Sequence, residues 1–136
     1  MSVVVDASVA LKWVLDEPGK DAAYALLDLD LIAPSLWLLE AANALWRIAK
    51  RGEITSREAL ERLETLFQAP VTATRLEQDL QNATIIANQI GHPVYDCLYL
   101  AMAIREDTYV ITADAKFVAA VSTWPDLRNR VRILVG

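Results

Sequence analysis

Histidine and cysteine are nearly absent from this sequence of 136 residues, which contains one of each, His92 and Cys97. A zinc site made of imidazoles and thiolates needs about four such ligands, and an internal disulfide needs a second cysteine. Both are therefore excluded within this sequence. Any metal that the chain binds must be held by oxygen ligands.

Long hydrophobic segments are also missing. The longest unbroken apolar run is the eight residues from Cys97 to Ile104, whereas a membrane-spanning helix needs about 20. The first residues lack a basic region, and their apolar stretch ends at Asp6, which is not typical of a signal peptide. We expect a cytoplasmic protein with no membrane segment.

Glycine is rare, with four residues, and no Pro-, Ser- or Gly-rich tract divides the chain. Repeats are absent as well. A hydrophobic fraction of 54% in 136 residues is typical of one well-buried core. We predict a single domain over residues 1–136.

Positive charge is in deficit, because 13 Lys and Arg stand against 18 Asp and Glu, a net charge of -5. Proteins that coat duplex nucleic acid have the opposite balance. A nucleic-acid substrate would therefore have to be held by a few local contacts.

Short β-branched runs alternate with helical patterns along the chain. The apolar periodicities and turn residues predict strands over residues 3–5, 31–33, 70–72, 109–112 and 131–135. They predict helices over residues 7–15, 20–29, 36–50 with Ser35 as its N-cap, 76–90 with Leu80 in its apolar stripe, 97–105 and 116–121, and one that begins in the capping box 55–58. The helix over residues 97–105 is apolar on every face and is expected to be central. Strands joined through helices indicate right-handed βαβ crossovers, hence an α/β fold with a parallel sheet of about four to five strands.

Two carboxylates follow strands directly. Asp6 comes after the first strand, and Asp114 lies two residues past the strand that ends at Thr112. Ligands of open parallel sheets bind outside the carboxyl ends of the strands, so both side chains are expected to face one crevice. The alternative is that each aspartate simply caps the helix that follows it.

Two further carboxylates interrupt apolar helices. Glu40 lies within about 60° of Asn43 and Arg47 on a helix that is otherwise apolar, and Asp96 opens a helix with no other charged side chain before Arg105. A solvated stripe for Glu40 and an N-cap for Asp96 are the alternatives. A buried carboxylate is costly unless it is paired or binds a cation.

Together these four acids suit a Mg²⁺ or Mn²⁺ site, because those ions prefer carboxylate and water oxygens. Such a site is typical of phosphodiester hydrolysis by an activated water. No histidine or cysteine nucleophile is then required.

The chain resembles the PIN domains, and within them the VapC toxins of toxin–antitoxin pairs. The resemblance spans essentially all 136 residues and is carried by four segments in a fixed order. Their sequences are VVVDAS from Val3, EAANAL from Glu40, YDCLYLAMA from Tyr95 and ITADAKF from Ile111.

This resemblance implies a three-layer α/β/α fold and a Mg²⁺-dependent ribonuclease, with Mn²⁺ as a substitute. It implies that the catalytic acids are Asp6, Glu40, Asp96 and Asp114. Asp6, Asp96 and Asp114 would bind the metal, while the surrounding hydrogen-bonded groups would be Ser8, Asn43 and Thr112. Some relatives carry further acids after the position of Asp114, where this chain has Ala115 and Lys116. The number of metal ions therefore stays open.

Two other functions are weighed beside the ribonuclease. A catalytically inactive PIN-like interaction domain would keep the fold, but all four acids are present. An aspartate-nucleophile phosphotransfer enzyme usually has a second acid beside the first strand, and here that place is taken by Ser8.

Apolar side chains between residues 36 and 67 exceed what one buried stripe per helix can absorb. We predict that these two helices contact a second copy of the chain and a VapB-type antitoxin, and that DNA is contacted only through the antitoxin. The side chains concerned are Trp37, Leu38, Leu45, Trp46, Leu66 and Phe67.

Overall fold

A five-stranded parallel β-sheet forms the centre of the protein, in a computed structural model that describes residues 1–135. β1 (Ser2–Val5) is the middle strand, and every strand pairing is parallel. The strand order is β3-β2-β1-β4-β5, and the other strands are β2 (Asp30–Pro34), β3 (Val71–Thr74), β4 (Val110–Thr112) and β5 (Val131–Ile133). The α/β class and the parallel sheet are confirmed.

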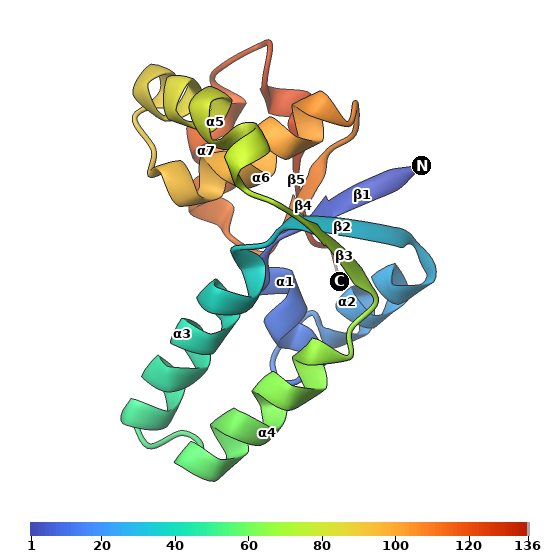
Figure 1. Ribbon diagram of the computed structural model, residues 1–136, viewed down its shortest axis with the longest axis vertical. Helices are drawn as coiled ribbons and strands as arrows, with labels where there is room; N and C mark the ends of the chain where they lie inside the picture. Colours follow the sequence, from blue (N-terminus) through green and yellow to red (C-terminus); the bar gives the residue numbers. More distant parts are fainter. Residues whose placement is uncertain (136) are drawn as a thin grey trace.

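Helices cover both faces of this sheet, which gives the three predicted layers (Figure 1). One layer contains α5, α6 and α7, and the other contains α1 to α4 (Figure 1). The helices are α1 (Ala7–Ala10), α2 (Lys20–Ala25), α3 (Trp37–Lys50), α4 (Ser56–Phe67), α5 (Glu77–Ile90), α6 (Val94–Arg105) and α7 (Ala115–Ser122).

The core is built around β1 and α6. Val3, Val4 and Val5 are buried, as expected for a strand covered on both faces, and α6 is buried continuously from Cys97 to Ala103. The apolar sequence of α6 predicted a central helix, which is confirmed. Since α6 also contacts β1, β2 and β4, it fixes the position of its first turn relative to the strand ends.

Two predicted helix starts are wrong. Ser35 does not cap α3, because its N–H donates to the Thr74 carbonyl and prolongs the β2–β3 ladder, so that Leu36 takes the cap position. α6 begins at Val94 after Pro93, so Asp96 lies in the first helical turn and is not an N-cap.

α5 also departs from its predicted pattern. Leu80 was expected to face inward but is 41% exposed. Asp79 is buried instead and accepts two hydrogen bonds from Arg105 on α6, at 2.8 and 3.0 Å. A charged pair thus replaces the expected apolar contact between these helices.

Several predicted boundaries shift. The helices expected over residues 7–15 and 20–29 each end in a tighter 3₁₀ turn, Leu11–Trp13 and Leu26–Asp28. The last strand stops at Ile133, two residues early. In the part of the chain that the structure describes, no helix is long and apolar enough to cross a membrane.

Candidate active site

Asp6 occupies the junction between β1 and α1. Its side chain is 6% exposed, and its Oδ1 accepts hydrogen bonds from the Ser8 hydroxyl at 2.5 Å and from the Val9 N–H at 3.3 Å. The contact with Val9 caps α1, so the alternative that Asp6 is an N-cap is confirmed. The carboxylate also borders a cavity, which a cap alone does not require.

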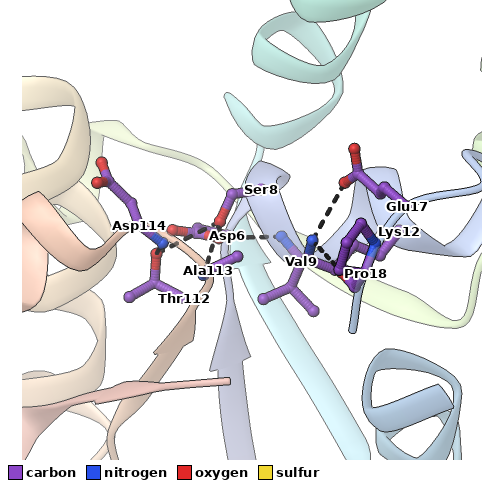
Figure 2. Close-up of polar contacts among 9 residues, drawn as sticks. All are labelled: Asp6, Ser8, Val9, Lys12, Glu17, Pro18, Thr112, Ala113 and Asp114. Carbon is purple, nitrogen blue, oxygen red and sulfur yellow. Dashed lines mark hydrogen bonds and ion pairs between the residues drawn. The ribbon is translucent and has the colours of Figure 1, made fainter. Parts of the chain in front are cut away.

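Asp114 holds the equivalent place after β4 and caps α7, accepting from the Lys116 N–H at 2.9 Å. Hydroxyl groups connect it to the β1 end: Ser8 and Thr112 lie 3.3 Å apart, Oγ to Oγ1, and the Asp114 N–H donates to Thr112 Oγ1 at 3.0 Å. The Ala113 N–H donates to Ser8 Oγ at 2.9 Å. Figure 2 shows these groups gathered where the two neighbouring strands end.

Glu40 reaches the same region from α3. Its Oε1 accepts a hydrogen bond of 2.5 Å from the hydroxyl of Tyr99, which is fully buried in α6. A fully solvated Glu40, the alternative considered above, does not account for this contact, because one of its carboxylate oxygens is held by a buried hydroxyl. Tyr99 was not singled out from the sequence, because its place in an apolar run is typical of a core residue.

Asp96 has a partner that sequence reasoning missed. His92 Nε2 lies 2.6 Å from Asp96 Oδ2, and the His92 ring stacks on Phe117 with centroids 5.3 Å apart. His92 does lie in the turn between α5 and α6, and its contact with Asp96 was not expected from the sequence. A separation of four residues is the spacing at which side chains meet on one face of a helix, and this could have indicated the contact. Pro93 made a helical spacing unexpected, because it places His92 before the start of α6.

One cavity of about 280 Å³ brings the predicted acids together. Carboxylates from four separate elements border it, along with the side chains of Asn43 and Arg47 on α3. The acids are Asp6, Glu40, Asp96 and Asp114, and Ser8 lies beside them. Thr112 contributes from beneath through its hydrogen bonds to Ser8 and Asp114.

Burial and mutual repulsion raise the pKa values of two of these acids, Asp6 and Glu40. Desolvation raises the pKa of Asp6 from 3.8 to about 6. Hydrogen bonds from Ser8, Thr112 and Val9 oppose this rise, and the negative charge of Asp96 adds slightly to it. The pKa of Glu40 is also raised, first by burial and then by Asp96 and Asp6, while the Tyr99 hydrogen bond lowers it. Perturbed carboxyl groups in a cleft are typical of a functional site.

The donor chemistry of this cavity fits a hard divalent cation. Its walls offer carboxylate, amide and hydroxyl oxygens. A cation there would relieve the unfavourable ionisation of Asp6, which burial and Asp96 both oppose. Among residues 1–135, no three acidic, histidine or cysteine side chains are close enough to enclose an ion, so the acids line one cavity without meeting at one point.

Comparisons with known proteins agree with this architecture. The PIN domain family model matches residues 3–121, a range that includes all four acids. Ribonuclease VapC3 of Pyrobaculum aerophilum is 32% identical over an alignment of 130 residues, and the match covers 90% of this chain and 99% of that protein.

Solved structures share the fold. PAE2754 from Pyrobaculum aerophilum superposes with a TM-score of 0.68 at 21% identity, covering 98% of this chain and 90% of that one. VapBC2 from Rickettsia felis, solved with a DNA fragment from its promoter, gives 0.65 at 14% identity, covering 99% and 100%. VapC20 from Mycobacterium tuberculosis, a sarcin–ricin loop cleaving toxin, gives 0.61 at 15%, covering 87% and 94%. With the family model matched over most of its length, this chain belongs to the PIN domain family.

Proposed function

We propose that this protein is a Mg²⁺- or Mn²⁺-dependent endoribonuclease that acts as the toxin of a VapBC-type toxin–antitoxin pair. The observation that carries the proposal is the convergence of four carboxylates, each from a different part of the chain, on one cavity. Similarity to a ribonuclease over almost the full length supports the substrate.

Three acids are proposed to hold the cation, either directly or through waters that the cation keeps: Asp6, Asp96 and Asp114. When bound, Mg²⁺ would neutralise the scissile phosphate and lower the pKa of the attacking water. Oxygen ligands favour Mg²⁺ or Mn²⁺ over softer metals.

The chain's own residues prepare the remaining steps. Ser8 and Val9 fix the orientation of Asp6 by hydrogen bonding to one of its oxygens, and this leaves Oδ2 free of those contacts. Tyr99 holds Glu40 at the cavity wall, where Glu40 can accept a proton from water. Arg47 brings a guanidinium to the same cavity, and guanidinium groups bind phosphate through paired hydrogen bonds.

The decisive experiment measures cleavage of a mixed RNA substrate by the purified protein. We expect cleavage with Mg²⁺ or Mn²⁺, none with EDTA, and recovery when either metal is restored. Asp96→Asn should abolish cleavage and leave the circular dichroism spectrum unchanged, whereas Asp16→Asn, at an exposed aspartate outside the cavity, should cut normally.

Full activity in EDTA would overturn the metal-dependent mechanism. Wild-type rates for Asp96→Asn would overturn the site. An increase in melting temperature on adding Mn²⁺ to the wild type, but not to Asp96→Asn, would support ion binding independently of cleavage.

The proposed partners are a second copy of the chain and a VapB-type antitoxin, both on α3 and α4. Three of the six predicted contact residues are wrong, because Trp37, Leu45 and Leu66 are buried in the core. Of the other three, Trp46 and Phe67 are exposed as expected and Leu38 is half-buried. Leu60, which is exposed on α4, was not in the prediction. Between these helices lies an apolar groove of about 210 Å³ bordered by Trp46, Leu60 and Leu63.

The cytoplasm, where RNA is accessible, is the proposed location. The net charge of -5 gives the chain no general attraction for duplex DNA, so contact with DNA is proposed only through the antitoxin.

A further inference from the structure

A second cavity, of about 530 Å³, adjoins the acidic one. The two share three side chains of α3, namely Glu40, Asn43 and Arg47. Since the same residues form a wall of both, a polymer bound with one group at the acids has an adjacent space for its next group.

Exposed apolar and aromatic side chains line the unshared part of this second cavity. Tyr95 is 62% exposed and Leu39 is 69% exposed, and Leu36 lies beside them. Tyr95 immediately precedes Asp96 in the first turn of α6, which ties its position to that of the acid. Within residues 1–135, its hydroxyl forms no hydrogen bond, so the fold gives this tyrosine no structural task comparable to that of Tyr99.

Arg47 supplies charge where the two cavities meet. It is exposed, and none of the ion pairs among the described residues includes it. An aromatic ring beside an unpaired guanidinium matches a nucleotide, whose base stacks on a ring and whose phosphate pairs with the cation.

We propose that this second cavity is a nucleobase subsite in which Tyr95 stacks on an unpaired base next to the scissile phosphate, with Arg47 holding the connecting phosphate. The proposal rests on the proposed ribonuclease function and refines its substrate to unpaired RNA. Bases within a duplex are already stacked on their neighbours and cannot reach the Tyr95 ring.

The second cavity is separate from the apolar groove proposed to contact protein partners. The apolar groove between α3 and α4 uses Ala42, Leu45, Trp46 and Ala49 of α3, none of which borders the second cavity. At about 100° per residue, these positions lie on a different face of the helix from Glu40, Asn43 and Arg47. The groove and the subsite can therefore be altered separately.

Steady-state kinetics on a single-stranded RNA oligonucleotide test the subsite. Tyr95→Ala should raise KM roughly tenfold, in keeping with the usual cost of losing one base–aromatic stack, while kcat changes less than about twofold. Tyr95→Phe keeps the ring and should restore the wild-type KM. Ile85→Ala truncates an apolar side chain of similar exposure, 57%, on α5, outside both cavities and outside the proposed partner surface, and should leave KM unchanged.

A binding measurement separates this proposal from the ribonuclease function. The same oligonucleotide with a single 2-aminopurine is mixed with protein in EDTA, where fluorescence quenching reports stacking without cleavage. Quenching by the wild type and Tyr95→Phe, but not by Tyr95→Ala, supports the subsite even if no RNA is cut.

Cleavage by the wild type with an unchanged KM and equal quenching for Tyr95→Ala would overturn the subsite and leave the ribonuclease function intact. Absence of RNA cleavage with either metal would overturn the function, and the quenching experiment would still decide the subsite.

Discussion

The hydroxyl of Tyr99 on α6 donates a 2.5 Å hydrogen bond to Glu40 Oε1 on α3, across the wall of the acidic cavity. The acceptor belongs to the proposed catalytic set, and the donor belongs to the core. The packing of α6 therefore sets the direction of a carboxylate on another helix.

Replacing Tyr99 with phenylalanine removes that donor and keeps the ring. The free energy of unfolding should fall by about 2 kcal/mol at pH 8, the usual value for a hydrogen bond to a charged group. The pKa of Glu40 should rise further above its ordinary value, because the hydrogen bond that lowers it is lost. The acid limb of the pH–rate profile should then move to higher pH.

Urea denaturation and rates between pH 5 and 9 provide these measurements, with Tyr109→Phe as the control, since the Tyr109 hydroxyl has no hydrogen bond among the described residues. An acid limb in Tyr99→Phe that matches the wild type would show that Glu40 does not control the rate.

Asp6 should make the metal-free protein less stable as the pH rises. The unfolded chain loses the Asp6 proton near pH 3.8, whereas the folded protein retains it until about pH 6. The folded state thus binds more protons between these values, and the free energy of unfolding falls across this window by an amount of about 3 kcal/mol at most. Above pH 6 this contribution is constant.

Denaturation in EDTA at pH 4, 5, 6 and 7 measures the fall. Asp6→Asn, which retains the oxygen acceptor for Ser8 and Val9, should remove most of it. Glu40 should account for the remainder, because its pKa is raised too. Persistence of the full fall in Asp6→Asn would assign the effect to other groups.

Loss of the ion pair between Asp79 and Arg105 should destabilise the fold without changing the chemistry. Asp79 is 1% exposed and is bound through both oxygens, and neither residue borders the acidic cavity. Arg105→Ala leaves a buried carboxylate unpaired, at a cost of about 3 to 5 kcal/mol. Activity per folded molecule should stay at the wild-type level.

Urea denaturation compares this variant with Arg75→Ala, which breaks the exposed pair between Arg75 and Glu77 and should cost less than about 1 kcal/mol. Equal losses in the two variants would mean that burial of Asp79 adds nothing to the pair.

Self-association through α3 and α4 should respond little to salt, because exposed apolar side chains dominate the surface between them. Sedimentation at micromolar concentration is expected to show a dimer in both 50 mM and 500 mM NaCl, and Trp46→Ser with Leu60→Ser should shift it toward monomer. RNA binding should weaken steeply over the same range. A wild-type monomer at both salt concentrations would remove the dimer from the proposal.

Local signals in the sequence predicted most of the fold. The β-branched run Val3–Val5 and the apolar helix around Leu100 have environments that a short segment specifies by itself. The capping box was also local, and the Thr55 and Glu58 contacts at 2.9 and 3.0 Å confirm it. Ser35 was misassigned because its N–H bonds to Thr74, a residue 39 positions away that no local pattern identifies.

The candidate site also contains residues that local sequence patterns identified and residues that they did not. Asp6 and Asp114 were found from their positions after strands, a rule that depends only on the parallel sheet. Tyr99, the partner of Glu40, was missed because the contact depends on how α3 and α6 pack. His92, the partner of Asp96, was missed although it lies only four residues away, because Pro93 places it outside the helix. Tyr95 was passed over because exposure of an aromatic side chain is a property of the folded surface.

The contact between Ser8 and Thr112 joins residues 104 positions apart, and β1 leaves the ribosome well before β4. Until β4 is made, β1 has an open edge on that side, and the hydroxyl network below the acids cannot form. A nascent chain that has not reached Asp114 also lacks the fourth carboxylate. Synthesis of β4 and Asp114, rather than of the β1 segment that carries Asp6, therefore sets the moment at which the cavity can first form.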